Sequence, residues 1–163
     1  MAIATLQDLF IEQLGDLLDA EKQLVKALPD MAEASSSSQL RKAFQHHLQQ
    51  TEGQVERLEQ VFNLIGVEAE PGSCKAMEGL VKEAKEILKD ASEPAVVDAG
   101  LIAAAQKVEH YEIASYGSVR AWAEELGNAQ AVKLLETTLN EESAANEKLT
   151  EIAESRVNAS AAR

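Results

Sequence analysis

The strongest constraint on the fold is a set of four long segments in which apolar residues return every three or four positions. In the first segment, residues 5–34, the series is Leu6, Phe10, Leu14, Leu17, Leu24 and Leu28. Residues with this spacing lie along one face of an α-helix, and that face is buried against another element. Thr5 and Asp8 match a capping box at its start. Pro29 need not end the helix, because Met31 continues the series.

Three further segments have the same pattern. The second, residues 37–66, is expected to begin at Ser37 or Ser38, because serine hydroxyls favour helix caps, and to end at a glycine. The third and fourth span residues 92–127 and 128–157, and the tail is expected to fray from about residue 157. The residues expected to point inward on these helices include Leu40, Phe44, Thr51, Leu58, Phe62, Leu101, Val108, Ser115, Val119, Trp122, Leu126, Val132, Leu135, Leu139 and Leu149.

The connection between the second and third long helices is long, whereas the other two are tight. Residues 67–93 contain a turn at 71–73 and one short helix over residues 76–88. A helix of about 28 residues is roughly 42 Å long at 1.5 Å per residue, and a connection of this length can return the chain over that distance. The expected fold is therefore all-α. It is a single domain over residues 1–163, a four-helix bundle in the up-down-down-up order of ferritin-like bundles, with a short helix in the crossover.

Charge and composition exclude several classes of function. The chain has 15 Lys and Arg against 28 Asp and Glu, a net charge of −13, so neither nucleic acid nor a membrane surface is an expected partner. No apolar run approaches the roughly 20 residues of a membrane span, and the N-terminus lacks a basic secretory stretch. With a single cysteine, Cys74, the chain fits a reducing compartment, and we expect a cytoplasmic protein.

Glutamates interrupt the apolar series on three of the four helices. Glu21, Glu112 and Glu142 each lie between apolar residues of a buried stripe, and Gln50 lies in the corresponding part of the second helix. At 1.5 Å per residue, these four positions lie about 21–24 Å from the same end of the bundle and form one layer. Carboxylates in a desolvated layer repel one another unless cations share them. The layer therefore predicts a site for one or two iron or manganese ions.

Four other polar residues lie close to this layer. Glu109 and His47 are about one turn above it, and Gln54 and Asn146 are within about a turn below it. The position of His47 is equally consistent with a metal ligand and with a hydrogen-bonded core residue. The position of Glu109 is equally consistent with an inward-facing side chain and with one at a solvated edge of the helix. Gln50 and Gln54 could bridge carboxylates through hydrogen bonds.

The match to a standard di-iron centre is partial. Ferritin-like sites present one Glu from each of two helices and a Glu-x-x-His motif from each of the other two. Three residues after Gln50 and Glu142, this chain has Gly53 and Ala145 instead of histidine. The number of ions therefore remains open.

Five segments together carry a resemblance to a known family: Asp19–Leu24, His47–Thr51, Gln54–Arg57, Cys74–Leu80 and Ala103–Gly117. Over about residues 6–152, the chain resembles the YciF-like stress proteins. The resemblance implies a ferritin-like fold, a homodimer, a bacterial stress response and a metal site of undefined role. The ligands it implies are Glu21, the position of Gln50, Glu109 or Glu112, and Glu142. A glutamate is expected where this chain has Gln50, and a neutral amide weakens affinity for a hard cation.

Two functions remain open. In the first, the chain is a metal-binding ferritin-like protein that takes part in metal handling or protection against oxidative stress; any enzymatic activity would be ferritin-like di-metal chemistry with oxygen or peroxide. In the second, it is a non-catalytic structural or interaction protein whose polar layer is metal-free. The metal content of the purified protein separates the two.

Overall fold

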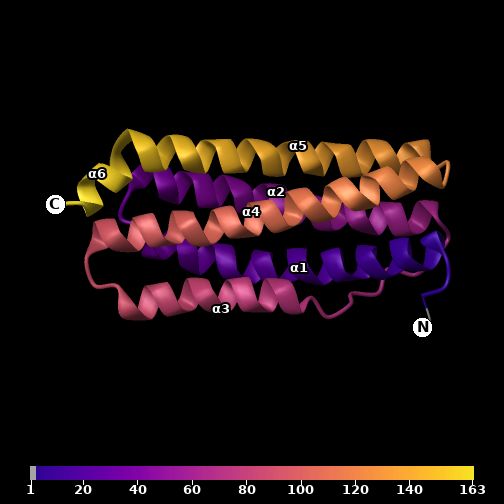
Figure 1. Cartoon of the computed structure of the whole chain (residues 1–163), viewed down its shortest axis with the longest axis horizontal. Helices are drawn as coiled ribbons and strands as arrows, with labels where there is room; N and C mark the ends of the chain where they lie inside the picture. Colours follow the sequence, from indigo (N-terminus) through magenta and orange to yellow (C-terminus); the bar gives the residue numbers. More distant parts are fainter. Residues whose placement is uncertain (1–2) are drawn as a thin grey trace.

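The computed structural model describes residues 3–163, and its long helices begin and end close to the predicted positions (Figure 1). The helices are α1 (Leu6–Ala34), α2 (Ser38–Leu64), α3 (Lys75–Asp90), α4 (Pro94–Glu125) and α5 (Ala129–Ile152), followed by a π-helical turn (Ala153–Val157) and α6 (Asn158–Ala161). The long helices α1, α2, α4 and α5 form a bundle, and α3 packs against α1 and α4. Among the described residues, none of the helices combines the length and the apolar character that a membrane crossing requires.

Local sequence signals place the helix ends. The Thr5 hydroxyl accepts a hydrogen bond from the Asp8 N–H at 3.1 Å, and the Asp8 carboxylate accepts one from the Thr5 N–H at 2.9 Å, which confirms the capping box. Ser37 caps α2 as expected. Gly66 and Gly127 follow α2 and α4 with φ angles of 70° and 76°, a left-handed conformation that glycine adopts without steric cost.

One buried side chain fixes the start of α4 to the turn between α1 and α2. The Asp98 carboxylate accepts hydrogen bonds from the Ser36 N–H at 2.8 Å, the Ser36 hydroxyl at 2.6 Å and the Ser37 N–H at 2.8 Å. Because α2 and α4 both begin at this end of the bundle, they run in the same direction, while α1 and α5 run in the opposite one (Figure 1). This is the up-down-down-up order expected from the long crossover.

The crossover lies close against α1. The Gly72 N–H donates a hydrogen bond to the Gly15 carbonyl at 2.7 Å, and a Cβ atom on Gly15 would lie only 3.1 Å from the Glu70 carbonyl oxygen. A residue with a side chain at position 15 would therefore require the crossover backbone to shift by a few tenths of an ångström.

A layer of buried polar side chains divides the hydrophobic core into two halves. The half near the α1–α2 turn includes Leu24, Leu28, Leu40, Phe44, Met77, Leu101, Leu149 and Ile152. The other half includes Phe10, Leu14, Leu58, Phe62, Tyr116, Val119 and Leu135. The polar residues buried between them are Glu21, His47, Thr51, Gln54, Glu109, Glu112, Thr138 and Glu142. The bundle thus holds its acidic side chains in the middle, shielded from solvent at both ends.

Two expectations differ from the structure. The tail does not fray at residue 157, because Val157 is only 4% exposed and the chain stays helical through Ala161. Burial of Val157 against the first core half compensates the entropy of ordering the tail. Leu126, expected in the core, is 36% exposed, because it caps the end of α4 and lies beyond the last packed turn.

Candidate metal centre

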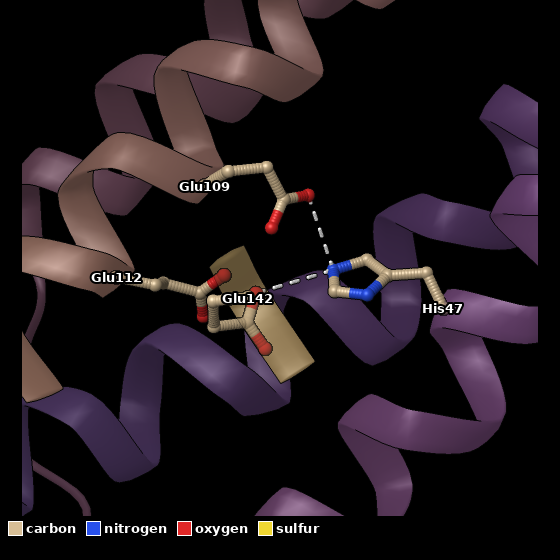
Figure 2. Close-up of side chains that lie close together, drawn as sticks. All are labelled: His47, Glu109, Glu112 and Glu142. Atoms are coloured by element: carbon tan, nitrogen blue, oxygen red, sulfur yellow. Dashed lines mark ion pairs between the residues drawn. The ribbon is translucent and has the colours of Figure 1, made fainter. Parts of the chain in front are cut away.

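Four buried side chains from three helices converge within the polar layer (Figure 2). His47 comes from α2, Glu109 and Glu112 from α4, and Glu142 from α5, and each offers one ligand atom within 4.8 Å of the others. The His47 Nε2 atom lies 3.3 Å from Glu109 Oε1 and 3.7 Å from Glu142 Oε2. Exposure is 6% for His47 and at most 1% for the three glutamates.

Helical spacing explains why these side chains meet. Glu109 and Glu112 are three residues apart, so both lie on the inner face of α4. Glu142 is seven residues from the buried Leu135 and seven from the buried Leu149, which places it on the inner stripe of α5. His47 follows the buried Phe44 by three residues on α2. The apolar stripes that build the core therefore direct these polar groups into it.

Two carboxylates of the polar layer accept hydrogen bonds from Tyr116 and Gln54, which do not belong to the four-residue cluster. The Tyr116 hydroxyl donates to Glu21 Oε1, and the Gln54 amide donates to Glu142 Oε1. Gln54 also donates to Glu141 Oε2 at 3.1 Å, and Arg57 pairs with the same carboxylate. These contacts orient Glu21 and Glu142 and each use one oxygen atom.

Several other atoms of the layer have no hydrogen-bond partner among the described residues. They are Oε2 of Glu21, Glu109 and Glu142, both carboxylate oxygens of Glu112, and both ring nitrogens of His47. The His47 Nε2 atom is close to two carboxylates but is not aligned for a hydrogen bond to either of them. Buried polar atoms in folded proteins nearly always have a partner. A cation shared by these atoms would satisfy them together.

Burial changes the acidity of the layer. Desolvation raises the pKa of Glu21, Glu109 and Glu112 well above the ordinary range, and repulsion from neighbouring carboxylates raises it further. For Glu21, the Tyr116 hydrogen bond opposes this shift in part. The pKa of Tyr116 is also raised, first by its burial and then by the carboxylates beside it. The raised pKa values therefore favour the protonated, neutral form of these carboxyl groups in the folded protein.

These raised pKa values predict the pH dependence of the metal-free protein. In the unfolded chain the same glutamates have ordinary pKa values of about 4.3, so above that pH the folded state binds more protons than the unfolded state. The free energy of unfolding then falls as the pH rises from about 4.5 through the folded-state pKa values. We expect a lower melting temperature at pH 8 than at pH 5.5, measured by calorimetry in chelator, with a shallower decline for Glu112→Gln. A stability that rises with pH equally in both proteins would contradict this.

The structure places the other predicted site residues around the cluster. Glu21 is fully buried beside it, and Gln54 is fully buried and bonded to Glu142. Gln50 is half-buried and lines a pocket next to His47. Asn146 is half-buried, and its side-chain oxygen accepts a hydrogen bond from Gln106 at 3.3 Å. On α2, His47 and Gln54 therefore enter the layer, and Gln50 lies to one side of it.

Two contributors could not be identified from the sequence. Tyr116 donates to Glu21 across the bundle, from 95 residues away along the chain, and Arg57 joins Glu141 beside Gln54. Neither residue belongs to a metal-binding spacing pattern. The available signal is general: a buried tyrosine hydroxyl or a partly buried arginine usually has a polar partner. This signal does not say which residue the partner is.

The donor set suits a first-row transition ion. One imidazole nitrogen and three carboxylates form a mixed nitrogen and oxygen environment, which iron and manganese accept. Ligand bonds of roughly 2.1 Å place opposite ligands about 4.2 Å apart. That span is similar to the 4.8 Å within which the four ligand atoms lie. The identities and positions of these residues are therefore compatible with a single ion.

Comparison with known proteins identifies the family to which this chain belongs. A family described as "Domain of unknown function (DUF892)" matches residues 5–162. Protein YciF of Escherichia coli is 48% identical over 159 residues, which cover 97% of this chain and 96% of that protein.

Solved structures agree with this match. The crystal structure of the E. coli stress protein YciF superposes with a TM-score of 0.92 over 96% of this chain and 99% of that one. YcfI from Rhodopseudomonas palustris, 47% identical, superposes with a TM-score of 0.89 over 91% and 94% of the two chains. A ferritin-like diiron-carboxylate protein from Bacillus anthracis, 17% identical, has a TM-score of 0.69 over 92% and 99% and shares the fold. This chain has a ferritin-like fold and belongs to the DUF892 family, as a homologue of the stress protein YciF.

Proposed function

We propose that this protein binds iron or manganese in the carboxylate layer, and that the bound metal serves metal handling or protection against oxidative stress. One observation carries the proposal: three glutamates and a histidine meet in the core, and most of their ligand atoms have no hydrogen-bond partner among the described residues. Burying such groups costs several kcal/mol unless a cation compensates them. The family relationship to a stress protein and the fold shared with a diiron-carboxylate protein support the same proposal.

In this proposal the side chains have distinct roles. His47, Glu109, Glu112 and Glu142 hold the first ion, and Glu21 is the carboxylate available to a second one. Gln54 and Tyr116 orient Glu142 and Glu21 through their hydrogen bonds. The apolar residues on both sides of the layer separate it from solvent at the two ends of the bundle. A bound iron or manganese ion would supply redox chemistry with oxygen or peroxide.

Metal loading of the purified protein tests the proposal. Chelator-treated protein is reloaded either with iron(II) in the absence of oxygen or with manganese(II), and unbound metal is removed by desalting. The number of metal ions per chain is then measured by elemental mass spectrometry. We expect at least one ion per chain for the natural sequence and a strong loss for Glu142→Gln. The matched control is Glu147→Gln, an exposed position on the same helix, which should bind as the natural protein does. Well under one ion per chain in the natural protein would overturn the proposal.

The alternative is a structural protein with a metal-free polar layer. Internal donors from Gln54 and Tyr116, together with protons held by the glutamates, favour it. The relative from R. palustris is provisionally described as a structural protein. In this alternative the chain forms an obligate homodimer. A monomer at micromolar concentration in light scattering would count against it, and metal binding to the layer would exclude it.

A further inference from the structure

A pocket of about 470 Å³ lies between α2 and α5, beside the candidate metal centre, and the proposed function does not use it. Its inner part includes His47 and Glu109. Most of its wall is apolar, formed by Phe44, Leu149 and three alanines, and the lining also includes the polar residues Gln39, His46 and Gln50. This volume falls in the range of about 300–1,000 Å³ that small-molecule sites occupy.

A small residue helps to form the pocket. Ala145 stands where a ferritin-type motif on α5 would have a histidine, three residues after Glu142, and it lines the cavity. His47 also lines it, with an Nδ1 atom that is buried and has no hydrogen-bond partner among the described residues. The departure from the di-iron motif therefore leaves space next to the cluster.

The charge around the pocket is opposite to that of the chain. The net charge of the protein is −13, yet the exposed charged residues of the lining are Lys42 and Lys148. The acidic residue of the lining, Glu109, is buried at its inner part. Lys148 contacts Glu151 at 2.8 Å, but both side chains are more than half exposed, and such a pair contributes about 0–1 kcal/mol. Both lysines are thus available to an anionic ligand.

We propose that this pocket binds a small organic carboxylate with an apolar body. The carboxylate lies near Lys42 and Lys148, and the hydrocarbon part extends along Phe44, Ala145 and Leu149 towards His47. Lysine side chains attract an anion and repel a cationic ligand, while the apolar wall favours a hydrocarbon over a small inorganic anion. The binding does not depend on the proposed metal function, because every group in contact with the ligand belongs to the metal-free protein.

Calorimetric titration of the metal-free protein with octanoate tests the inference, with octylamine and octanol as ligands of equal chain length and different charge. We expect saturable binding of octanoate, at least about tenfold tighter than octylamine. Octanol should fall between the two. Absence of octanoate binding at millimolar concentration, or equal binding of octylamine, would overturn the proposal.

Variants locate the binding site. Ala145→Leu fills the cavity and should weaken octanoate binding by at least about tenfold. Lys42→Gln combined with Lys148→Gln changes only exposed positions and should weaken it by about three- to thirtyfold. The matched control, Lys75→Gln with Lys82→Gln on α3, should leave binding unchanged. Equal losses in both lysine pairs would indicate general charge attraction and contradict a site here. The proposal would also be contradicted if a second copy of the chain covers this pocket. In that case Ala145→Leu would change the self-association of the protein, measured by light scattering.

Discussion

Saturating manganese(II) is expected to raise the melting temperature of the metal-free protein by about 5–10 °C. A ligand at a concentration 100 times its dissociation constant stabilises the folded state by about 2.7 kcal/mol. In a domain of this size, each kcal/mol corresponds to a shift of roughly 2–4 °C. The gain arises because the ion displaces protons from the buried glutamates and satisfies atoms that otherwise have no partner. Differential scanning calorimetry at pH 7.5, with and without manganese, measures it.

The substitution Glu112→Gln is expected to remove most of this gain. Glu112 is fully buried and its two carboxylate oxygens have no hydrogen-bond partner among the described residues, so both are free to bind an ion. Glutamine has nearly the same shape but is neutral, so the core packing is retained while the anionic ligand is lost. Glu147→Gln, exposed on α5, serves as the control and should keep the full gain. An unchanged melting temperature in the natural protein, or an equal loss in the control, would contradict the metal site.

The substitution Asp98→Ala is expected to destabilise the protein by about 3 kcal/mol, a fall of roughly 6–12 °C in melting temperature. Asp98 is 3% exposed and accepts three hydrogen bonds from Ser36 and Ser37. Alanine leaves these donors without their acceptor at the turn that joins α1 to α2. The free energy of unfolding is measured by urea denaturation at constant pH.

Two comparisons make this prediction specific. Asp90→Ala, at the exposed end of α3, should change stability by less than about 0.5 kcal/mol. Because Asp98 lies at the end of the bundle and outside the polar layer, folded Asp98→Ala should still gain stability from manganese. A loss below about 1 kcal/mol would show that the start of α4 is held to the turn by other contacts.

The ends of the long helices could be predicted because they depend on residues that are close together in the sequence. The capping box at Thr5, the cap at Ser37 and the two left-handed glycines act within a few positions of the chain, so their signals are complete in the sequence. The tail was harder to predict. Whether residues 158–161 are ordered depends on the burial of Val157 against distant residues.

The candidate site was predicted in part for the same reason. Glu21, Glu112 and Glu142 interrupt apolar stripes, and all three are fully buried. On α2, the stripe contains His47, Thr51 and Gln54, at spacings of four and three. Gln50 lies about 60° to one side of His47, because three residues turn an ideal helix by roughly 300°. Height along the bundle placed Gln50 in the layer and His47 above it, because height carries no information on which side of a helix a residue lies.

The sequence by itself determined the helices, their order and the presence of acidic residues on the buried faces, because helical periodicity and capping are local properties. Only the tertiary structure decided which polar side chains meet. The positions of His47 against Glu109, of Tyr116 against Glu21 and of Gln54 against Glu142 depend on the rotation and height of helices distant in sequence. A rotation of one helix by a single residue, about 100°, would move its polar group from the layer to the surface. Packing of the two apolar core halves sets those rotations, and thereby brings the carboxylates together.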